Sequence, residues 1–390
     1  MVTKLKIALA QLNPLVGDVI GNTKKLIDVR SKLDEDIDIL VAPELYISGY
    51  PIDDLVLRED FLDLVEKEIN NLAKITADNK SAIIVGAPRK NANSIKNSVF
   101  VIEKGEIISV KDKHELPNTG VFDEQRIFEK GVLENCVKIK GVNFGLPICE
   151  DIWKETVLKK LSQSGAEIII AINASPFTIS KYDERNDIAL SRVKETKLPI
   201  VYLNRTGGQD ELIFDGSSFS LNYDGKKFSS LEEFKEDIST IHFEKNNGKW
   251  IGYGNVKENS SQSERLYKAL VLGLRDYVKN NKFSGVVLGL SGGVDSALVA
   301  ALATDAFGSK FVQAIMLPSP YTGEESLKDA RDAATLLNIK YSNLKISEAM
   351  KVVDEILGDF KGPNFTAGIT EENIQSRLRG LLLMALSNRY

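Results

Sequence analysis

A glycine-rich loop with an apolar run on either side is the strongest structural signal in this chain. Val286-Val287-Leu288 precedes the loop, the apolar stretch 297–307 follows it, and the loop itself is Gly289-Leu290-Ser291-Gly292-Gly293-Val294-Asp295-Ser296. This order predicts a strand, a tight loop and a helix. Adjacent glycines let a backbone approach a ligand closely, and the free N–H groups at a helix start bind anions. We therefore expect these eight residues to hold the pyrophosphate of a nucleotide.

The last residues of the loop distinguish it from other phosphate loops. It lacks the Gly-Lys-Ser/Thr ending of kinase-type loops, and Asp295 would repel a phosphate unless a cation bridged the two. Ser291-Gly292-Gly293 with Asp295-Ser296 resembles the SGGxDS loop of ATP pyrophosphatases, which adenylate a substrate and release pyrophosphate. The alternative is a glycine-rich turn without function, and the flanking strand and helix weigh against it.

Length and composition limit the classes of protein to which this chain can belong. A chain of 390 residues, 43% of them hydrophobic, can bury two cores, so two domains are expected. Basic and acidic residues number 50 and 55, and no basic block indicates nucleic acid or a membrane surface as a partner. The only cysteines are Cys136 and Cys149, and neither a signal segment nor a membrane-length apolar run is present. These features favour a reducing cytoplasm and small polar substrates.

Residues 1–245 alternate strand-like and helix-like patterns, which predicts an α/β domain. A helix is expected at residues 61–78, and short apolar strands are expected at 6–11, 38–42, 82–87, 98–102, 144–148, 168–173 and 200–204. Glycine and small polar residues concentrate in residues 246–260, which we expect to be a linker.

A second domain is expected over residues 261–390. A helical pattern at 264–280 precedes the glycine-rich loop, and the run at 311–317 supplies the next strand of a doubly wound parallel sheet. The sequence stops within a helical pattern, so we expect this domain to be incomplete at its C-terminus.

Ionisable and nucleophilic side chains gather at the ends of predicted strands in the first domain. They include Glu44, Lys113 and Cys149. A thiol needs a base and a nearby positive charge to become a nucleophilic thiolate, and a glutamate with a lysine supplies both without histidine. On composition alone, a surface glutamate, a surface lysine and a core cysteine explain the same residues equally well.

The segments around these three residues resemble those that carry the Glu-Lys-Cys triad of the nitrilase family. The similar segments are Pro43-Glu44-Leu45, Lys113 with Leu116-Pro117-Asn118, and Ile148-Cys149-Glu150-Asp151. Over nearly its whole length the chain is similar to the glutamine-dependent NAD synthetase family. The further matches are Gly49-Tyr50-Pro51, Gly120-Val121-Phe122-Asp123-Glu124, Asn173-Ala174-Ser175-Pro176-Phe177, Leu317-Pro318-Ser319, Ser326-Leu327-Lys328-Asp329-Ala330 and residues 370–380.

For the first domain the resemblance implies a nitrilase-like four-layer αββα fold and a glutaminase. Cys149 would attack the side-chain amide of glutamine, and Glu44 would act as general base. Lys113, with the backbone N–H that follows Cys149, would stabilise the charged intermediate. Glu124 occupies the place of a second structural or catalytic glutamate in this family.

The resemblance also assigns residues that bind glutamine. Ser175 and Lys181 match positions that contact this substrate in the family, whereas Thr119 stands where the family usually has tyrosine. A threonine can form a hydrogen bond but cannot stack or reach as far, so one substrate contact should be weaker here.

For the second domain the resemblance implies a partial doubly wound sheet of the adenine nucleotide α-hydrolase type. ATP would adenylate the nicotinate carboxylate of deamido-NAD, and ammonia would then displace AMP to give NAD. The eight loop residues would bind ATP, Asp295 would bind Mg²⁺, and Asn373 would contact deamido-NAD. Without the resemblance, Asn373 is equally well a solvated residue at a helix start. The family's second metal-binding carboxylate would follow Tyr390, and we also expect a homo-oligomer.

Other functions fit the sequence less well. Asparagine synthetase would need an N-terminal cysteine, but Val2 follows Met1, and the enzyme that makes GMP would need a Gly-x-Cys-x-Gly elbow, which Cys149 lacks. One alternative of a different class remains open: an amidase or nitrilase fused to a module that senses a nucleotide without turnover.

Overall fold

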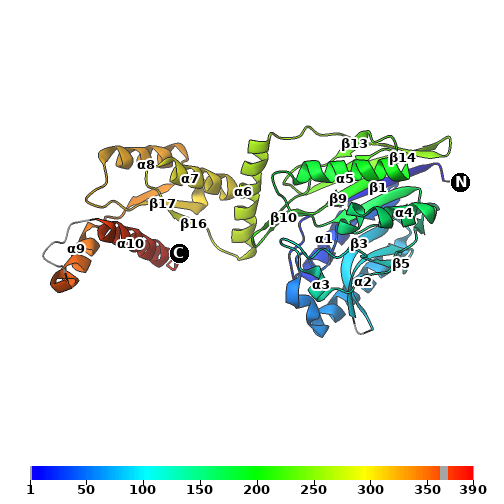
Figure 1. Ribbon diagram of the computed structural model, residues 1–390, viewed down its shortest axis with the longest axis horizontal. Helices are drawn as coiled ribbons and strands as arrows, with labels where there is room; N and C mark the ends of the chain where they lie inside the picture. The colour runs from blue at the N-terminus through cyan, green and yellow to red at the C-terminus, as the bar shows by residue number, and fades with distance from the viewer. Residues whose placement is uncertain (1, 93, 361–367, 390) are drawn as a thin grey trace. The chain divides into compact units, whose positions relative to one another are not determined.

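The structure is a computed structural model that describes residues 2–92, 94–360 and 368–389. The chain divides into two compact units, Met1–Ala269 and Leu270–Tyr390, and each is described by itself (Figure 1). Within the described residues, no helix has both the length and the apolar character needed to cross a membrane.

The first unit contains a seven-stranded sheet with the order β15-β14-β1-β2-β3-β4-β5. Strands β1, β2 and β3 are parallel neighbours, and the other pairs are antiparallel. The strands are β1 (Lys4–Gln11), β2 (Ile39–Val41), β3 (Ala82–Asn91), β4 (Ser94–Glu103), β5 (Glu106–Asp112), β14 (Asp237–Asn246) and β15 (Lys249–Tyr253).

A six-stranded sheet with the order β13-β12-β9-β8-β7-β6 lies against the first. Its central strands β7, β8 and β9 are parallel. The strands are β6 (Val137–Ile139), β7 (Val142–Gly145), β8 (Ile168–Asn173), β9 (Ile200–Asn204), β12 (Phe219–Leu221) and β13 (Lys227–Ser230). A separate ribbon pairs β10 (Thr206–Gln209) with β11 (Leu212–Asp215).

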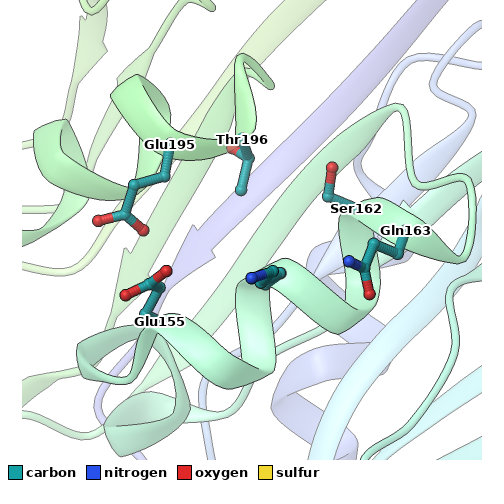
Figure 2. Close-up of a pocket in the computed structure, with 6 residues that line it drawn as sticks. Glu155, Ser162, Gln163, Glu195 and Thr196 are labelled. Atoms are coloured by element: carbon teal, nitrogen blue, oxygen red, sulfur yellow. The ribbon is translucent and has the colours of Figure 1, made fainter.

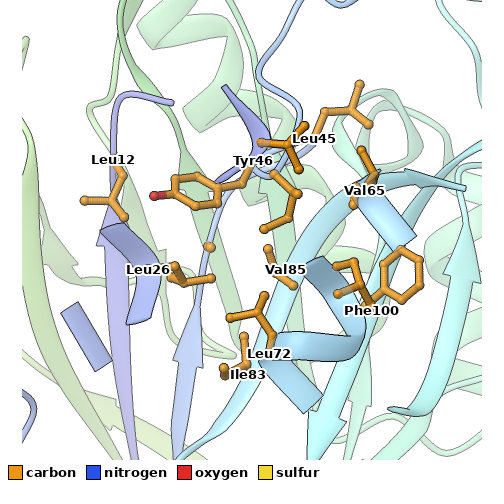
Figure 3. Packing of buried hydrophobic residues seen from close by; sticks show 14 of the residues in the cluster. Leu12, Leu26, Leu45, Tyr46, Val65, Leu72, Ile83, Val85 and Phe100 are labelled. Carbon is orange, nitrogen blue, oxygen red and sulfur yellow. The ribbon is translucent and has the colours of Figure 1, made fainter. Parts of the chain in front are cut away.

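Side-chain alternation along the strands separates three apolar layers. Ile7 of β1 and Ile170 of β8 lie in the apolar layer between the sheets, whereas their neighbours along each strand lie in the layers that contain helices. Helices α1 (Val19–Ser31) and α2 (Glu59–Ile75) cover the first sheet, and α4 (Glu155–Gln163) and α5 (Lys181–Thr196) cover the second. Figure 3 shows Leu26 of α1 and Leu72 of α2 in the same apolar cluster as Ile83 and Val85 of β3. This order of layers is αββα, as expected from the nitrilase resemblance.

The segment expected to be a linker differs from that expectation. Residues 249–253 form strand β15, which pairs with β14 at the edge of the seven-stranded sheet. Trp250 of β15 is buried in the layer between the sheets, so an apolar anchor outweighs the flanking glycines and small polar residues. Residues 254–260 have no regular structure, and α6 (Gln262–Asn280) follows them.

The second unit is built on a parallel sheet with the order β16-β17-β18. Helices α7 (Val294–Phe307) and α8 (Glu324–Leu336) pack on one face, and α9 (Ser347–Ile356) and α10 (Ile369–Ser387) pack on the other. The strands are β16 (Val286–Gly289), β17 (Val312–Met316) and β18 (Lys340–Asn343). Helices on both faces of a parallel sheet confirm the doubly wound prediction. The carboxyl ends of the strands meet at one edge, which is where such sheets bind ligands.

Candidate active site

Glu44 lies in the loop after β2 and has no exposed surface. Its Oε1 accepts hydrogen bonds from Lys113 Nζ at 2.7 Å and Asn97 Nδ2 at 2.9 Å, and its Oε2 accepts one from the Ala174 N–H at 2.8 Å. A buried carboxylate needs such partners because water cannot solvate it. Donors from three separate segments hold this group in one orientation, which suits a general base.

Lys113 follows β5, and its side chain is fully buried between two carboxylates. Nζ donates to Glu44 Oε1 at 2.7 Å and to both oxygens of Glu124 at 2.8 Å. Burial alone would lower the pKa of Lys113, but Glu124 and Glu44 raise this pKa well above its ordinary value. The group therefore stays an ammonium, and a fixed positive charge of this kind can stabilise an oxyanion.

Glu124 begins α3 (Glu124–Ile127) and completes the buried cluster. Tyr50 OH donates a hydrogen bond to its Oε1 at 3.0 Å. Burial, with a smaller contribution from Glu44, raises the pKa of Glu124 to about 7 against the opposing effect of Lys113. Near neutral pH this carboxyl is therefore close to its protonation midpoint, whereas Lys113 remains charged.

Cys149 begins a short 3₁₀ turn, Cys149–Trp153, that comes after β7. Its φ is +47°, a left-handed conformation that costs a non-glycine residue roughly 1–3 kcal/mol and that is concentrated at functional sites. Burial and the charge of Glu44 raise the pKa of the Cys149 thiol well above its ordinary value, although Lys113 lowers it. The resting group is a thiol, so it requires a base before it can act as a nucleophile.

Asp151 joins the turn that carries Cys149 to the segment that carries Lys113. Its Oδ2 accepts a hydrogen bond from the Ile148 N–H at 3.0 Å, and its Oδ1 accepts from the N–H groups of His114 and Glu115 at 3.0 and 2.7 Å. Burial raises the pKa of Asp151 to about 6, and these three donors favour its ionised form. The carboxylate therefore fixes the spacing between the nucleophile and the ammonium group.

The three residues assigned to substrate contacts lie in different environments. Ser175 is buried after β8, and its Oγ accepts a hydrogen bond from Arg185 Nε at 3.1 Å. Lys181 begins α5, with Nζ 4.7 Å from the ring centre of Trp153 in the turn that carries Cys149. Thr119 is exposed in the loop between β5 and α3, where its carbonyl accepts from the Phe122 N–H at 3.2 Å. The contacts therefore tie Lys181 to the nucleophile turn, whereas Thr119 lies on an accessible loop.

Several residues of this site had no assigned role in the sequence. Tyr50 and Ala174 lie within segments that resemble the family, so the residues beside them in sequence are the signal that could identify them. Asn97 carried no such signal, because only the pairing of β4 with β5 places it beside Lys113, whose N–H donates to the Asn97 carbonyl at 2.8 Å. Asp151 follows Cys149 by two positions, and its bridging role depends on the turn geometry.

The glycine-rich loop joins β16 to α7, with Gly293 as the residue that caps the helix. Ser291 and Ser296 hydroxyls lie 3.0 Å apart, and the Ser296 hydroxyl donates to the Gly293 carbonyl at 3.0 Å. Gly292 has a φ of +87°, and a Cβ there would lie 2.4 Å from the backbone oxygen of Ser326. The loop is thus closed on itself and requires glycine at position 292.

A cavity of about 350 Å³ opens beside this loop at the carboxyl ends of β16 and β17. Its lining includes Ser291 and Ser326 together with Arg379, whose Nε donates to the Leu317 carbonyl at 3.0 Å. Asp295 is exposed in the first turn of α7, and Asn373 is exposed on α10, where its side-chain oxygen accepts from Arg377 Nη1 at 3.1 Å.

Two further features of the structure concern metal ligands and a hollow away from the predicted site residues. In the part of the chain that the structure describes, no three acidic, histidine or cysteine side chains converge as metal ligands would. A second hollow of about 290 Å³, between α4 and the end of α5, is lined by Glu155, Glu195 and other polar residues (Figure 2). It contains none of the predicted site residues.

Comparisons with known proteins agree with both units. The carbon-nitrogen hydrolase family matches residues 6–249, and the NAD synthase family matches residues 266–390. Fold and site thus define an enzyme that joins a carbon-nitrogen hydrolase unit to an NAD synthase unit. The chain belongs to the glutamine-dependent NAD(+) synthetase family, and its relative from Rhodobacter capsulatus is 38% identical over 392 residues, which cover 100% of this chain and 71% of that protein.

Solved structures give the same result. The glutamine-dependent NAD(+) synthetase from Acinetobacter baumannii, in complex with ADP, superposes with a TM-score of 0.94 at 37% identity and covers 99% of this chain and 73% of that one. The amidase from Nesterenkonia sp. AN1 has a TM-score of 0.54 at 18% identity over 60% of this chain and 92% of its own. This second likeness concerns the fold of the first unit.

Proposed function

We propose that Cys149 is the nucleophile that hydrolyses glutamine and that the buried cluster of Glu44, Lys113 and Glu124 activates it. The observation that carries this proposal is the Lys113 ammonium held at 2.7–2.8 Å between two buried carboxylates. Burial, and then the charges of Glu44 and Glu124, raise the pKa of the Cys149 thiol. This arrangement provides a base and a positive charge close to a thiol that cannot ionise unaided.

The chemical steps start from a protonated Cys149 thiol and a protonated Lys113. Glu44 accepts the proton of the Cys149 thiol as sulfur attacks the amide carbon of glutamine, and the Lys113 ammonium and the backbone N–H after Cys149 stabilise the oxyanion. Glu44 then passes this proton to the amide nitrogen, the C–N bond breaks, and ammonia leaves. Glu44 next takes a proton from water, whose oxygen attacks the thioester carbon. The C–S bond breaks, glutamate is released, and the proton returns to sulfur.

Asp151→Asn is expected to lower kcat/KM for glutamine by roughly 10- to 100-fold. The substitution replaces one acceptor oxygen by an NH₂ group that faces backbone N–H donors, so the turn carrying Cys149 shifts relative to Lys113. Steady-state glutamate release measures the effect, and Glu155→Gln on the exposed surface of α4 is the control. A wild-type kcat/KM in a folded Asp151→Asn protein would show that Asp151 does not set this spacing.

We propose that Ser175, Lys181 and Thr119 contact glutamine. Lys181 lies beside the nucleophile turn, and its ammonium is suited to the carboxylate of the substrate. Thr119 adds a hydroxyl on the accessible loop, at the position where the family resemblance implies a tyrosine.

Thr119→Tyr is expected to lower the KM for glutamine by roughly threefold to tenfold while kcat stays within about twofold. A tyrosine ring adds contact area and reach to ground-state binding without touching the reacting atoms. Initial rates of glutamate release over a range of glutamine concentrations measure both constants. Thr119→Val removes the hydroxyl without adding a ring and should raise KM. An unchanged KM in both variants would remove Thr119 from the substrate site.

We further propose that ATP binds in the cavity of about 350 Å³, with its pyrophosphate on the loop from Gly289 to Ser296 and deamido-NAD reaching Asn373. The Acinetobacter baumannii relative was solved in complex with ADP, which supports an adenine nucleotide as a ligand of this chain. Mg²⁺ fits the donor chemistry at Asp295, because one carboxylate with phosphate oxygens and water makes an oxygen-only set. Mg²⁺ would neutralise phosphate charge there. A homo-oligomer and a cytoplasmic location remain predictions.

Isotope transfer tests this function. Protein supplied with ATP, Mg²⁺, deamido-NAD and glutamine labelled with nitrogen-15 at its side-chain amide should yield NAD that carries the label. The alternative, an amidase fused to a nucleotide-sensing module, yields labelled ammonia and no NAD. Release of glutamate without labelled NAD, in a protein that does form NAD from an added ammonium salt, would contradict transfer from the Cys149 site.

A further inference from the structure

Four charged side chains form a network beside residues 174–176, the substrate segment, which follows β8 and carries the proposed glutamine contact Ser175. Asp215 ends β11, Arg185 lies on α5, Arg265 lies on α6, and Glu233 lies in the loop after β13. We call these four residues the arginine network. Asp215 has no exposed surface, and the side chains of Arg185, Arg265 and Glu233 are at most 9% exposed. Two cations and two anions therefore balance one another away from water, where an unpaired charge is costly.

Arg185 fastens the network to the substrate segment. Its Nη1 donates to both oxygens of Asp215, at 2.8 and 3.0 Å. Its remaining donors reach the segment after β8: Nε donates to Ser175 Oγ at 3.1 Å, and Nη2 donates to the carbonyls of Ser175 and Pro176 at 2.7 and 2.9 Å. The N–H of the preceding residue, Ala174, donates to Glu44 at 2.8 Å. One guanidinium thus fixes the segment that contributes both a proposed substrate contact and a bond to the general base.

Arg265 completes the charge balance from α6. Its Nη2 lies 3.6 Å from Asp215 Oδ2, and its Nε lies 3.0 Å from Glu233 Oε1. Neither nitrogen makes a well-aligned hydrogen bond within the described residues, so the contacts are mainly electrostatic. The guanidinium also lies 4.5 Å from the ring centre of Tyr182, the residue after Lys181, and 5.8 Å from that of Phe177. Arg265 therefore lies beside Phe177, two residues after Ser175, and beside Tyr182, the residue after Lys181.

We propose that Arg265 is a positioning residue for glutamine binding, acting through Asp215 and Arg185 on Ser175 and through Tyr182 on Lys181. This inference rests on the proposed glutaminase function. Without Arg265, Asp215 and Glu233 lose a shared cation, and Arg185 becomes the only cation facing Asp215 among these four residues. The geometry of Arg185, and with it Ser175 and Pro176, then relaxes. Cys149 and Lys113 keep their own contacts, and Glu44 keeps its bonds to Lys113 and Asn97, so the effect falls on substrate binding more than on turnover.

Arg265→Met is expected to raise the KM for glutamine about tenfold while kcat stays within about twofold. Arg265→Lys retains the charge but not the planar fork, so it should recover part of the affinity. The matched control is Lys268→Met, which removes a charge from the same helix where Lys268 pairs with Glu264 in an exposed position. This control should keep the wild-type KM and kcat.

A further variant separates positioning from simple stabilisation. Arg265→Met leaves Glu233 buried without its cation, which lowers stability, and adding Glu233→Gln removes that stranded charge. The double variant should regain most of the wild-type thermal midpoint and still show the raised KM. A double variant with a wild-type KM, or a loss of kcat that follows the thermal midpoint across the series, would overturn the proposal. A wild-type protein that releases no glutamate would instead refute the proposed function.

Discussion

Cys149→Ala is expected to abolish glutamate release from glutamine, with a loss of roughly 10⁴-fold or more, because no other group can form the thioester. The ammonium group of Lys113 and the carboxylate of Glu44 stay in place in this variant, since their hydrogen bonds do not involve the thiol. In the full-length parent protein, synthesis of NAD from an ammonium salt should remain within about twofold of the wild-type rate, because added ammonia bypasses the first unit.

The control for this prediction is Cys136→Ala. Cys136 is the other free cysteine, half-buried, with its thiol donating to the Ser164 carbonyl at 3.1 Å. It should retain both activities. Loss of ammonia-dependent synthesis in a folded Cys149→Ala protein would contradict two chemically separate sites, and retention of glutamate release would remove Cys149 from the role of nucleophile.

Gly292→Ala is expected to give the reverse pattern, with ammonia-dependent NAD synthesis reduced roughly 100-fold or more and glutamate release retained. A Cβ at this position would lie 2.4 Å from the backbone oxygen of Ser326, and the φ of +87° is strained for any residue with a side chain. The carbonyl belongs to α8 and cannot rotate away, so the loop must move from the position in which we propose that it holds phosphate.

Gly308→Ala measures the backbone cost by itself. Gly308 has a φ of +85°, close to that of Gly292, but a Cβ there meets no atom within 4 Å. It should lower the thermal midpoint without the loss of synthesis. Equal loss of synthesis in the two variants would show that strain, and not displacement of the loop, explains the effect.

Much of the fold was predictable where burial leaves a strong pattern. Strand β8 is buried along its whole length, so its sequence is a continuous apolar run. The loop before α7 contains adjacent glycines between a strand pattern and a helix pattern, and this combination is specific enough to predict the loop. Strand β14 was not predicted, because only alternate positions such as Ile241 and Phe243 are buried and polar residues separate them. Strand β15 was not predicted, because the glycines on either side of the buried Trp250 indicate a loop.

The sequence predicts which residue types form the candidate site, but it does not predict the hydrogen bonds that connect them. Glu44, Lys113 and Cys149 stood out because a thiol chemistry without histidine needs that combination. Asn97 and Arg185 did not, because their roles arise from sheet pairing and from a helix packed over a distant strand. The raised pKa of the Cys149 thiol follows from burial, which depends on the completed fold.

The most direct test is to identify the covalent intermediate. Protein mixed with glutamine, quenched with acid within the first turnovers and digested with protease should contain a glutamyl thioester on the peptide that carries Cys149, detected by mass spectrometry. The peptide that carries Cys136, the only other cysteine of the chain, should be unmodified. Glutamate release from a protein that shows no adduct on Cys149 under these conditions, or an adduct on Cys136 alone, would contradict the assignment of the nucleophile.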